Sequence, residues 1–229
     1  MKLLAIDTSS LACTAGVLAG GVRHVRHAER EREHTRLLVP MIRDVLAAAA
    51  LEPRELDAVV LGNGPGSFIG LRIAAAVAEG IAYAAGLPVV PVSSLAAVAM
   101  RAGNRGDTVA VAQDAHMGEV YLGLYRIDGD GFPEPLIDER LQAVAPIDSL
   151  AGRAGPVVTA GAGWQRYPGL AEANRAPLLR PSAVLYPHAD EILALGARAR
   201  DGGAGIAPED VDPAYLRHDV ASPAPHRVP

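Results

Sequence analysis

Short apolar runs and amphipathic stretches alternate along the first hundred residues. Apolar runs bounded by turn residues predict buried strands, and apolar positions three and four apart predict helices with one apolar face. Strands are expected at residues 3–6, 13–18, 22–28, 58–61 and 89–92. Helices are expected at residues 35–49, 71–85 and 94–101, with Gly86 ending the second and Ser94 capping the third. This mixture of elements predicts an α/β fold.

The same order begins again after a break at residues 103–106. Strands are expected at residues 109–112, 120–127, 136–144 and 157–160, and a helix at residues 189–200. The segments AIDTSSLACTAGVL and AQDAHMGEVYLGLY each read as strand, aspartate, turn and strand, with a glycine nine residues after the aspartate. We interpret this as an internal duplication, although such short patterns also arise by chance. The predicted halves are residues 1–104 and 105–221, followed by a tail, residues 222–229, expected to be disordered.

The composition narrows the classes of function. Half of the residues are hydrophobic and the formal net charge is −5, which disfavours a protein that binds nucleic acid on its own. A single cysteine, Cys13, excludes a disulfide framework and fits a cytoplasmic protein. Asp7 interrupts the N-terminal apolar run too early for a signal peptide. Gly86, Pro88 and Pro91 interrupt the uncharged residues 80–100, so no membrane-spanning helix is expected there.

Two aspartates occupy matching positions after the first strand of each predicted half. Asp7, followed by Thr8 and Ser9, lies at the carboxyl end of its strand, the edge where α/β proteins bind ligands. A carboxylate there can hold hydrated Mg²⁺ while hydroxyls and turn amides face a phosphate. The alternative is a turn in which Asp7 bonds its own backbone, and the spacing alone favours this alternative.

The equivalent aspartate of the second half, Asp114, is followed by His116 and Met117, whose bulk keeps backbone amides away from a phosphate. Gly161 and Gly163 follow a predicted strand and could admit an adenine or ribose, or could form only a tight turn. Together with the turn at Asp7, these residues make up a weak predicted nucleotide site. No metal site is predicted, because His24 and His27 face opposite sides of their strand and no zinc-binding spacing occurs.

The segment NGPGSFIGLR, residues 63–72, has the glycine content of a phosphate-binding loop. Its spacing fits neither the Walker pattern, which needs Lys and then Ser or Thr after the last glycine, nor the dinucleotide-binding pattern. We interpret Gly64, Pro65 and Gly66 as a tight turn and Ser67 as the cap of the helix that follows. The backbone amides of this helix start could still attract an anion.

The helix expected after this loop is apolar or small on nearly every side. Arg72 and Glu79 are its only charged residues, and Ala76, Gly80 and Ala84 follow one another at helical spacing. Such a helix must be covered on more than one side. Either its own domain covers it, or a second protein packs on it and on the helix before it.

Five segments in chain order, AIDTSS, REHTRLLVPMI, GNGPGSFIGLRIA, QDAHMGEVYLGLY and DPAYLRHDVA, resemble the TsaB (YeaZ) family. Members of this family are the dimerisation subunit of the bacterial machinery that makes tRNA threonylcarbamoyladenosine. The resemblance covers nearly the whole chain. It implies an actin-like ATPase (ASKHA) fold, with two duplicated ribonuclease-H-like halves and mixed central sheets.

The resemblance also implies a non-catalytic scaffold. The expected partner is a TsaD-like catalytic subunit, which holds the metal and transfers a threonylcarbamoyl group to the N6 amine of adenosine 37 in tRNAs that read ANN codons. A TsaE-like ATPase joins this pair, tRNA is contacted through the complex only, and the isolated chain is expected to be a homodimer. The chain itself would need no cofactor, and ATP or ADP with Mg²⁺ at the complex interface is left open.

The family contacts its partner through two helices of the first half. The matching positions in this chain are Leu38, Met41, Ile42, Val45, Leu71, Ala75, Ala76, Gly80 and Tyr83. Two positions depart from the family pattern, because Ile69 stands where threonine is usual and His116 where arginine is usual. Ile69 removes a hydroxyl and so weakens a polar role of the loop, and His116 removes a permanent charge and so weakens the binding of a nucleotide. The alternative function is an autonomous actin-like-fold ATPase or small-molecule kinase that uses Asp7 and Asp114.

Overall fold

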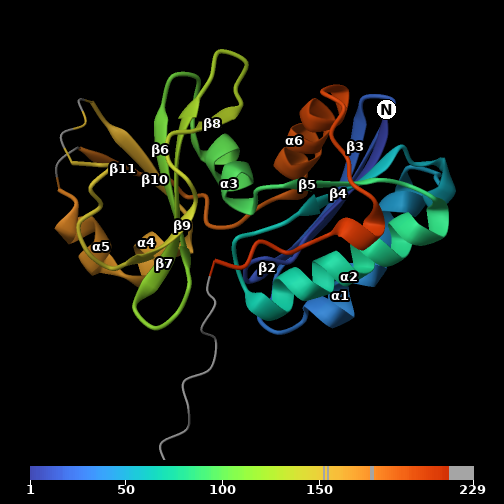
Figure 1. Ribbon diagram of the computed structural model, residues 1–229, viewed down its shortest axis with the longest axis horizontal. Helices are drawn as coiled ribbons and strands as arrows, with labels where there is room; N and C mark the ends of the chain where they lie inside the picture. Colours follow the sequence, from blue (N-terminus) through green and yellow to red (C-terminus); the bar gives the residue numbers. More distant parts are fainter. Residues whose placement is uncertain (152, 154, 176–177, 217–229) are drawn as a thin grey trace, which may run out of the picture.

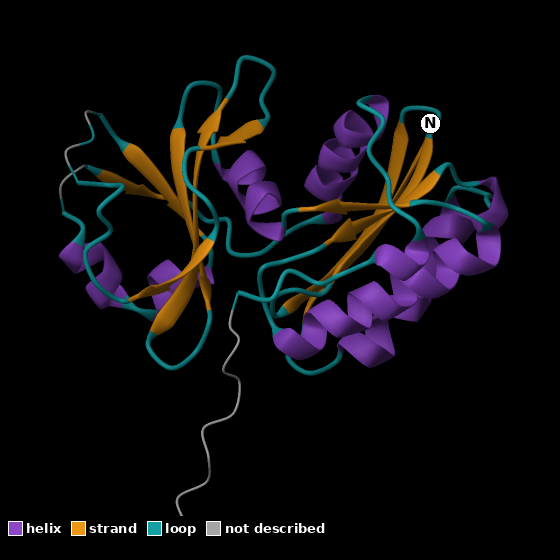
Figure 2. Cartoon of the chain, viewed as in Figure 1, coloured by secondary structure: helices purple, strands orange, loops and turns teal. Residues whose placement is uncertain are grey.

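The computed structural model describes residues 1–151, 153, 155–175 and 178–216. Two sheets form the centres of two lobes that stand side by side, with helices on their faces (Figure 1). Two long helices run next to each other along the first lobe, at the right of the view (Figure 2). The tail predicted at residues 222–229 lies outside the described residues, and so do residues 217–221 of the predicted second half.

The first sheet has the strand order β3-β2-β1-β4-β5. β1 pairs antiparallel with β2 and parallel with β4, so the sheet is mixed, as expected. All residues of β4 are buried, which explains its uninterrupted apolar sequence. The strands are β1 (Lys2–Asp7), β2 (Ala12–Ala19), β3 (Val22–Glu29), β4 (Ala58–Gly62) and β5 (Val89–Val92).

One face of the first sheet is covered by α1 (His34–Ala48) and α2 (Phe68–Ala85), and η1 (Pro53–Glu55) connects α1 to β4. α2 begins before the predicted residue 71, because the Ser67 hydroxyl accepts a hydrogen bond from the Gly70 amide and caps the helix. Gly86 ends α2 with a φ of 68°, in the left-handed conformation that the prediction requires.

The second sheet repeats the topology of the first. Its order is β11-β10-β6-β7-β8, with β9 also paired to β7. β6 pairs antiparallel with β7 and parallel with β10, as β1 does with β2 and β4, which confirms the internal duplication. The strands are β6 (Thr108–Asp114), β7 (Glu119–Ile127), β8 (Pro133–Pro135), β9 (Arg140–Ala143), β10 (Val157–Ala160) and β11 (Leu179–Pro181), and the short helices α4 (Ala162–Arg166) and α5 (Pro168–Ala173) follow β10. Of the single strand predicted at residues 136–144, only residues 140–143 form a strand, β9, and β8 lies just before the predicted range.

Two helices cross between the lobes. α3 (Ser94–Ala102) follows β5 of the first sheet but packs on the second sheet, where Leu95 and Val98 join its core. α6 (Ala189–Asp201) follows the second sheet but packs on the first, where Ile192 and Leu193 join the core. The two helices also contact each other. Each sheet is therefore covered by a helix from the other part of the chain.

After α6 the chain stays on the first lobe. Ile206 forms an isolated bridge with Val89, and η2 (Pro208–Asp210) lies against α2 (Figure 1). The division into residues 1–104 and 105–221 stays a prediction, and it did not anticipate that residues 189–216 pack on the first lobe.

The start of α3 corrects one predicted cap. Ser93, not Ser94, caps the helix, since its hydroxyl accepts a hydrogen bond from the Ala96 amide at 3.0 Å. The Ser94 hydroxyl instead donates to Asp7 Oδ2 at 2.6 Å. Two adjacent serines look alike in the sequence, and the position of Asp7 decides between them.

Candidate functional site

The carboxylate of Asp7 is buried and bonded within its own chain. Oδ1 accepts hydrogen bonds from the amide and the hydroxyl of Ser9, both at 2.8 Å, and Oδ2 accepts from Ser94. Burial raises the pKa of the Asp7 carboxyl, and these hydrogen bonds oppose that rise. The geometry is that of a turn that satisfies its own backbone, the alternative that the spacing favoured.

The loop before α2 packs directly on this turn. The Ser67 amide donates to the carbonyl oxygen of Ser9 at 2.7 Å, and the Thr8 hydroxyl donates to the carbonyl oxygen of Gly70 at 2.7 Å. A Cβ at Gly66 would collide with the Ser9 carbonyl, and a Cβ at Gly70 would collide with that of Thr8. The glycines therefore let the loop and the turn after β1 come into direct backbone contact.

The first part of the same loop is tied to α3. Gly64 has a φ of 86°, its amide donates to the Ser94 hydroxyl at 2.9 Å, and its carbonyl accepts from the Ser94 amide at 2.9 Å. The Gly64–Pro65 peptide is cis. Gly64, Pro65 and Gly66 thus form a turn, and Ser67 caps α2, as interpreted from the sequence.

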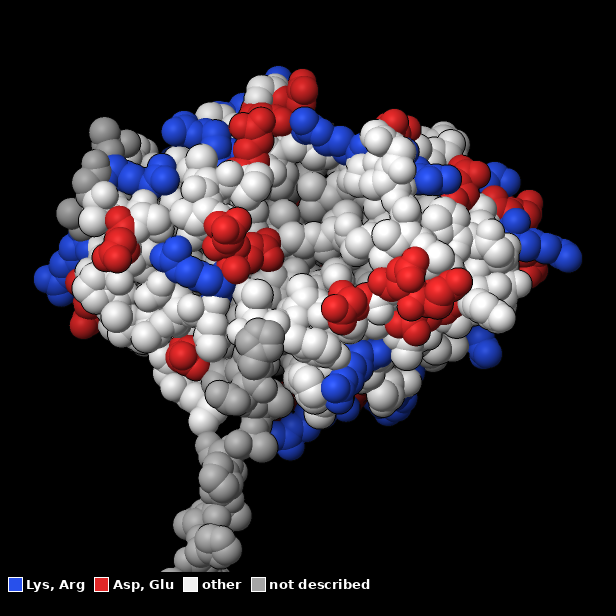
Figure 3. Space-filling view, in the orientation of Figure 1, with Lys and Arg blue, Asp and Glu red and all other residues white. Residues whose placement is uncertain are grey.

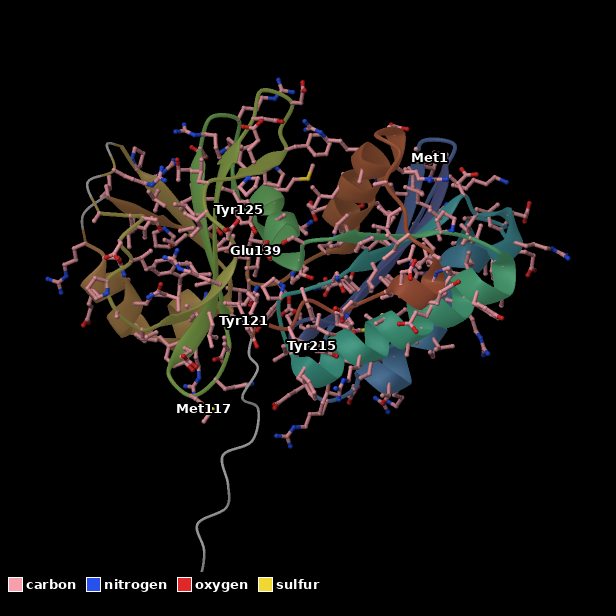
Figure 4. All side chains as sticks on the ribbon, viewed as in Figure 1. Met1, Met117, Tyr121, Tyr125, Glu139 and Tyr215 are labelled. Atoms are coloured by element: carbon pink, nitrogen blue, oxygen red, sulfur yellow. The ribbon has the colours of Figure 1, made fainter. Side chains whose placement is uncertain are left out.

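The second aspartate lies in a different environment. Asp114 Oδ1 accepts from the Tyr167 hydroxyl and from the His116 amide, both at 2.8 Å. His116 and Met117 adopt left-handed φ values of 61° and 56° at the tip of the β6–β7 turn, where Figure 4 labels Met117. The side chain of Asp114 thus bonds to its own lobe, and bulky residues form its turn.

Gly161 and Gly163 follow β10, and both press against β6. Gly161 has a φ of 97°, and a Cβ there would collide with the carbonyl oxygen of Ala112. At Gly163 a Cβ would lie 2.8 Å from that oxygen. The two glycines therefore form the tight strand-to-helix turn that the sequence left as an alternative to an adenine or ribose site. No group of His, Cys, Asp and Glu that could hold a metal ion occurs among the described residues.

The predicted interface residues do not all lie on the surface. Five of the nine have exposed fractions of 4% or less, and they form the core between the two helices and the sheet: Leu38, Ile42, Val45, Leu71 and Ala75. Their side chains cannot contact a partner directly, because the apolar stripe of α1 faces its own sheet. Met41 is half-buried, and Ala76, Gly80 and Tyr83 are exposed on α2.

The exposed side of α2 is an apolar face. We define the α2 face as the exposed or half-buried residues Ile69, Ile73, Ala76, Gly80 and Tyr83, which recur four and three residues apart. Ile69 is 69% exposed and Tyr83 is 77% exposed. Only a third of α2 is buried, and by length and composition it is the one described helix apolar enough to cross a membrane, a test that helices of soluble proteins also pass. Ile69, a departure from the family pattern, thus lies on this face. Its spacing to Ile73 and Ala76 is the sequence signal for that position.

A cluster of two rings and a guanidinium lies at the start of the α2 face. The guanidinium carbon of Arg72 lies 3.7 Å from the centroid of the Phe68 ring, and Nε donates to the Tyr215 hydroxyl at 3.0 Å. The rings of Phe68 and Tyr215 are 5.1 Å apart. Figure 4 shows Tyr215 beside this end of α2, although it is 143 residues away in the sequence. No local sequence pattern could have revealed this cluster.

Two hollows lie near these elements. One, of about 490 Å³, borders the other end of the α2 face and is lined by Tyr83, Leu87, Pro88, Ile206 and Pro208 among others. The other, of about 220 Å³, lies between the lobes and is bordered by Asn63, Ser93 and Glu139 among others. At this hollow, Oε1 of Glu139 accepts hydrogen bonds from the hydroxyls of Ser93 and Tyr125 (Figure 4). Burial raises the pKa of the Glu139 carboxyl.

The duplicated mixed sheets and the exchanged helices place the chain in the actin-like (ASKHA) class of α/β proteins. The family model described as "TsaD: tRNA N6-adenosine threonylcarbamoyltransferase" matches residues 24–177. The chain is 35% identical to the tRNA threonylcarbamoyladenosine biosynthesis protein TsaB of Escherichia coli, over 96% of both chains. The TsaB protein of Haemophilus influenzae is 33% identical, over 96% of this chain and 95% of its own.

The solved structure of YeaZ from Pseudomonas aeruginosa is similar along nearly its whole length. It superposes with a TM-score of 0.85 at 35% identity, covering 94% of this chain and 99% of that one. The chain therefore belongs to the TsaB (YeaZ) family, as its sequence motifs indicate, and the expected fold class is confirmed.

Proposed function

We propose that this chain is a non-catalytic subunit in tRNA threonylcarbamoyladenosine biosynthesis. Through the α2 face it binds a TsaD-like catalytic subunit, which transfers the threonylcarbamoyl group to the N6 amine of adenosine 37 in tRNAs that read ANN codons. The exposed apolar side of α2, with Ile69 and Tyr83 at its two ends, carries this proposal. An exposed apolar area of this kind is typical of a protein-binding surface, and the name of the relatives, tRNA threonylcarbamoyladenosine biosynthesis protein TsaB, supports a partner that acts in the same biosynthesis.

The two aspartates support a scaffold rather than a catalyst. The carboxylate of Asp7 is used within its own turn, and that of Asp114 bonds to Tyr167 and to the turn after β6. An autonomous ATPase or small-molecule kinase would need both carboxylates open to Mg²⁺ and phosphate. Calorimetry of the isolated chain with Mg-ATP tests this alternative, because heat of binding at millimolar nucleotide would support it.

The remaining parts of the proposal concern assembly. A TsaE-like ATPase joins the pair, the isolated chain forms a homodimer, and the site of action is the cytoplasm. The chain needs no cofactor of its own, and any ATP or ADP with Mg²⁺ binds at the interface of the complex. tRNA is contacted through the complex only. In support, acidic and basic side chains are interspersed over the face shown in Figure 3, without a continuous basic area, and the net charge is −5.

The experiment is a binding measurement between the purified chain and the TsaD homologue of the same cell. Ala76→Glu places a charge in the middle of the α2 face and should abolish binding, because a carboxylate buried in an apolar interface loses its hydration even where Arg72, four residues before it, can pair with it. The matched control is Ala173→Glu, at an exposed position of α5 in the second lobe, which should bind as the unchanged chain does.

Activity of the complex gives a second readout. In a strain that depends on the variant gene, Ala76→Glu should lower the threonylcarbamoyladenosine content of tRNA, as measured by mass spectrometry of nucleosides. Normal binding and normal modification with Ala76→Glu would contradict the proposal.

A further inference from the structure

One basic side chain borders the α2 face. Arg72 is exposed at the start of the helix, next to Ile69 and Ile73, and the other charged residue of α2, Glu79, lies two turns away. A guanidinium that enters an apolar interface without an anion loses its hydration at a cost of several kcal/mol. A partner that covers this end of α2 must therefore supply a negative group.

Arg72 is held in place before any partner binds. Its guanidinium stacks on the Phe68 ring at 3.7 Å, and Nε donates to the Tyr215 hydroxyl at 3.0 Å. Tyr215 is fixed in turn by the segment before it, because the Asn63 side-chain amide donates to the Asp212 carbonyl at 2.9 Å and the Ala214 amide donates to the Asn63 carbonyl at 3.3 Å. Holding the side chain in one geometry removes part of the entropy cost of binding.

The outer edge of this guanidinium remains available. Within the described part of the chain, no carboxylate lies within ion-pair distance of Arg72 and its two terminal nitrogens have no hydrogen-bond acceptor. Arg101, Arg180 and Arg198, by contrast, each pair with a carboxylate at 3.1 Å or less. The terminal nitrogens of a fixed, planar guanidinium match the two oxygens of a carboxylate.

We propose that Arg72, positioned by Phe68 and Tyr215, binds an Asp or Glu side chain of the subunit that docks on the α2 face and so contributes to the choice of partner. The C-terminal segment, residues 211–216, thereby takes part in recognition although it does not belong to the interface helices. A protein carboxylate suits this position better than an RNA phosphate, because the side chains around Arg72 are apolar and no basic residue accompanies it on α2. This inference rests on the proposed function, since it uses the same face of the molecule.

The test is the affinity for the purified TsaD homologue, measured by calorimetry. Arg72→Met keeps an apolar chain on Phe68 but removes the charge, and it should weaken binding by roughly 10- to 100-fold. Tyr215→Phe keeps the ring and removes the acceptor of Nε, and it should weaken binding by a few-fold. The control Arg105→Met removes an exposed charge in the loop before β6 and should leave the affinity unchanged.

Salt gives a readout that a merely structural role would not change. Raising NaCl from about 0.05 to 0.5 M should weaken binding of the unchanged chain, and Arg72→Met should lose part of this dependence because one ion pair is missing. Thermal unfolding of the variants checks that each chain is folded.

The outcomes separate this inference from the proposed function. If Arg72→Met binds as tightly as Arg105→Met while Ala76→Glu does not bind, the carboxylate pair is overturned and the α2 face remains the interface. If Ala76→Glu also binds normally, the proposed interface itself fails. If Arg72→Met leaves subunit binding intact but lowers the affinity of the complex for tRNA, the ligand is a phosphate and the inference is overturned.

Discussion

At the scale of single residues, the glycines around α2 differ in what surrounds them. A Cβ at Gly66 or Gly70 would collide with backbone of the turn after β1, whereas a Cβ at Gly80 would meet nothing within 4 Å. The first two glycines are needed for contact between the loop and the turn. Gly80 lies in the exposed interior of a helix, where glycine only lowers stability through its backbone entropy. Composition alone does not distinguish these roles.

This difference predicts opposite effects of the same substitution. Gly70→Ala should lower the free energy of unfolding by about 2 to 3 kcal/mol, because the turn must move to admit a methyl group. Gly80→Ala should raise it by up to about 1 kcal/mol, because alanine is the better helix former. Urea unfolding of the two variants beside the unchanged chain measures both effects. A Gly70→Ala variant as stable as the unchanged chain would show that the loop and the turn do not pack as described.

At the scale of elements, most strands of both sheets could be predicted, because their apolar runs are bounded by clear turn residues. The apolar stripe of α1 could be predicted from its spacing in the same way, and so could the repeat of strand, aspartate and turn. α4, α5 and β11 were not predicted, because each is too short to show a periodic pattern. The side of α2 that faces solvent could not be derived, because its residues are small or apolar all round, and so Leu71 and Ala75, predicted at the interface, proved to be buried. The α1 positions Leu38, Ile42 and Val45 belong to the apolar stripe, which packs on its own sheet instead of on a partner.

The cap of α6 combines a hydrogen bond with a titratable group. His188 Nδ1 accepts from the Asp190 amide at 3.4 Å, and its ring lies 4.8 Å from that of His27. Burial, together with the smaller effects of the nearby Arg101 and His27, lowers the pKa of His188 from 6.5 to about 4, whereas Asp190 acts in the opposite direction. The second facing carboxylate, that of Glu191, is 3.8 Å from Nδ1 and pairs with Arg101.

A lowered histidine pKa predicts loss of stability in acid. The neutral ring stabilises the fold fully above pH 6.5, the ordinary value, and this contribution is lost as the pH falls from 6.5 towards 4. Between pH 7.5 and 5, the His188-dependent part of the free energy of unfolding should fall by about 1 to 2 kcal/mol. His188→Asn can still cap the helix and should lack this part, whereas His24→Asn on β3 should retain it. Equal pH profiles for the two variants would contradict the assignment to His188.

At the scale of the whole molecule, the informative contacts join residues that are far apart in the sequence. Arg72 meets Tyr215, Ser94 meets Asp7, and Ser93 meets Glu139 across the junction of the lobes. A single sequence without its fold contains no signal for such pairs. The turn at Asp7 and the helix after the glycine-rich loop could be identified from the sequence as candidate positions. That the loop packs on the turn, and that Tyr215 joins Phe68 and Arg72 at the start of α2, could be seen only in the tertiary structure.

One of these contacts can be tested as a connection between the lobes. Glu139→Ala removes the acceptor that the hydroxyls of Ser93 and Tyr125 share, and it leaves the buried Tyr125 hydroxyl with Ser93 alone. The free energy of unfolding should fall by about 2 kcal/mol. Glu134→Ala, at an exposed position of β8, should change it by less than about 0.5 kcal/mol. Similar stability of the two variants in urea would show that the Glu139 contact contributes little.

The exchange of α3 and α6 has a consequence for how the chain can be divided. A fragment that ended after β5 would hold all five strands of its sheet, yet one face of that sheet would be bare, since α6 is encoded nearly a hundred residues later. The second sheet would likewise lack α3. The two similar halves are therefore not independent modules. If one half is expressed alone, moved into another protein or deleted, one face of a sheet is left uncovered.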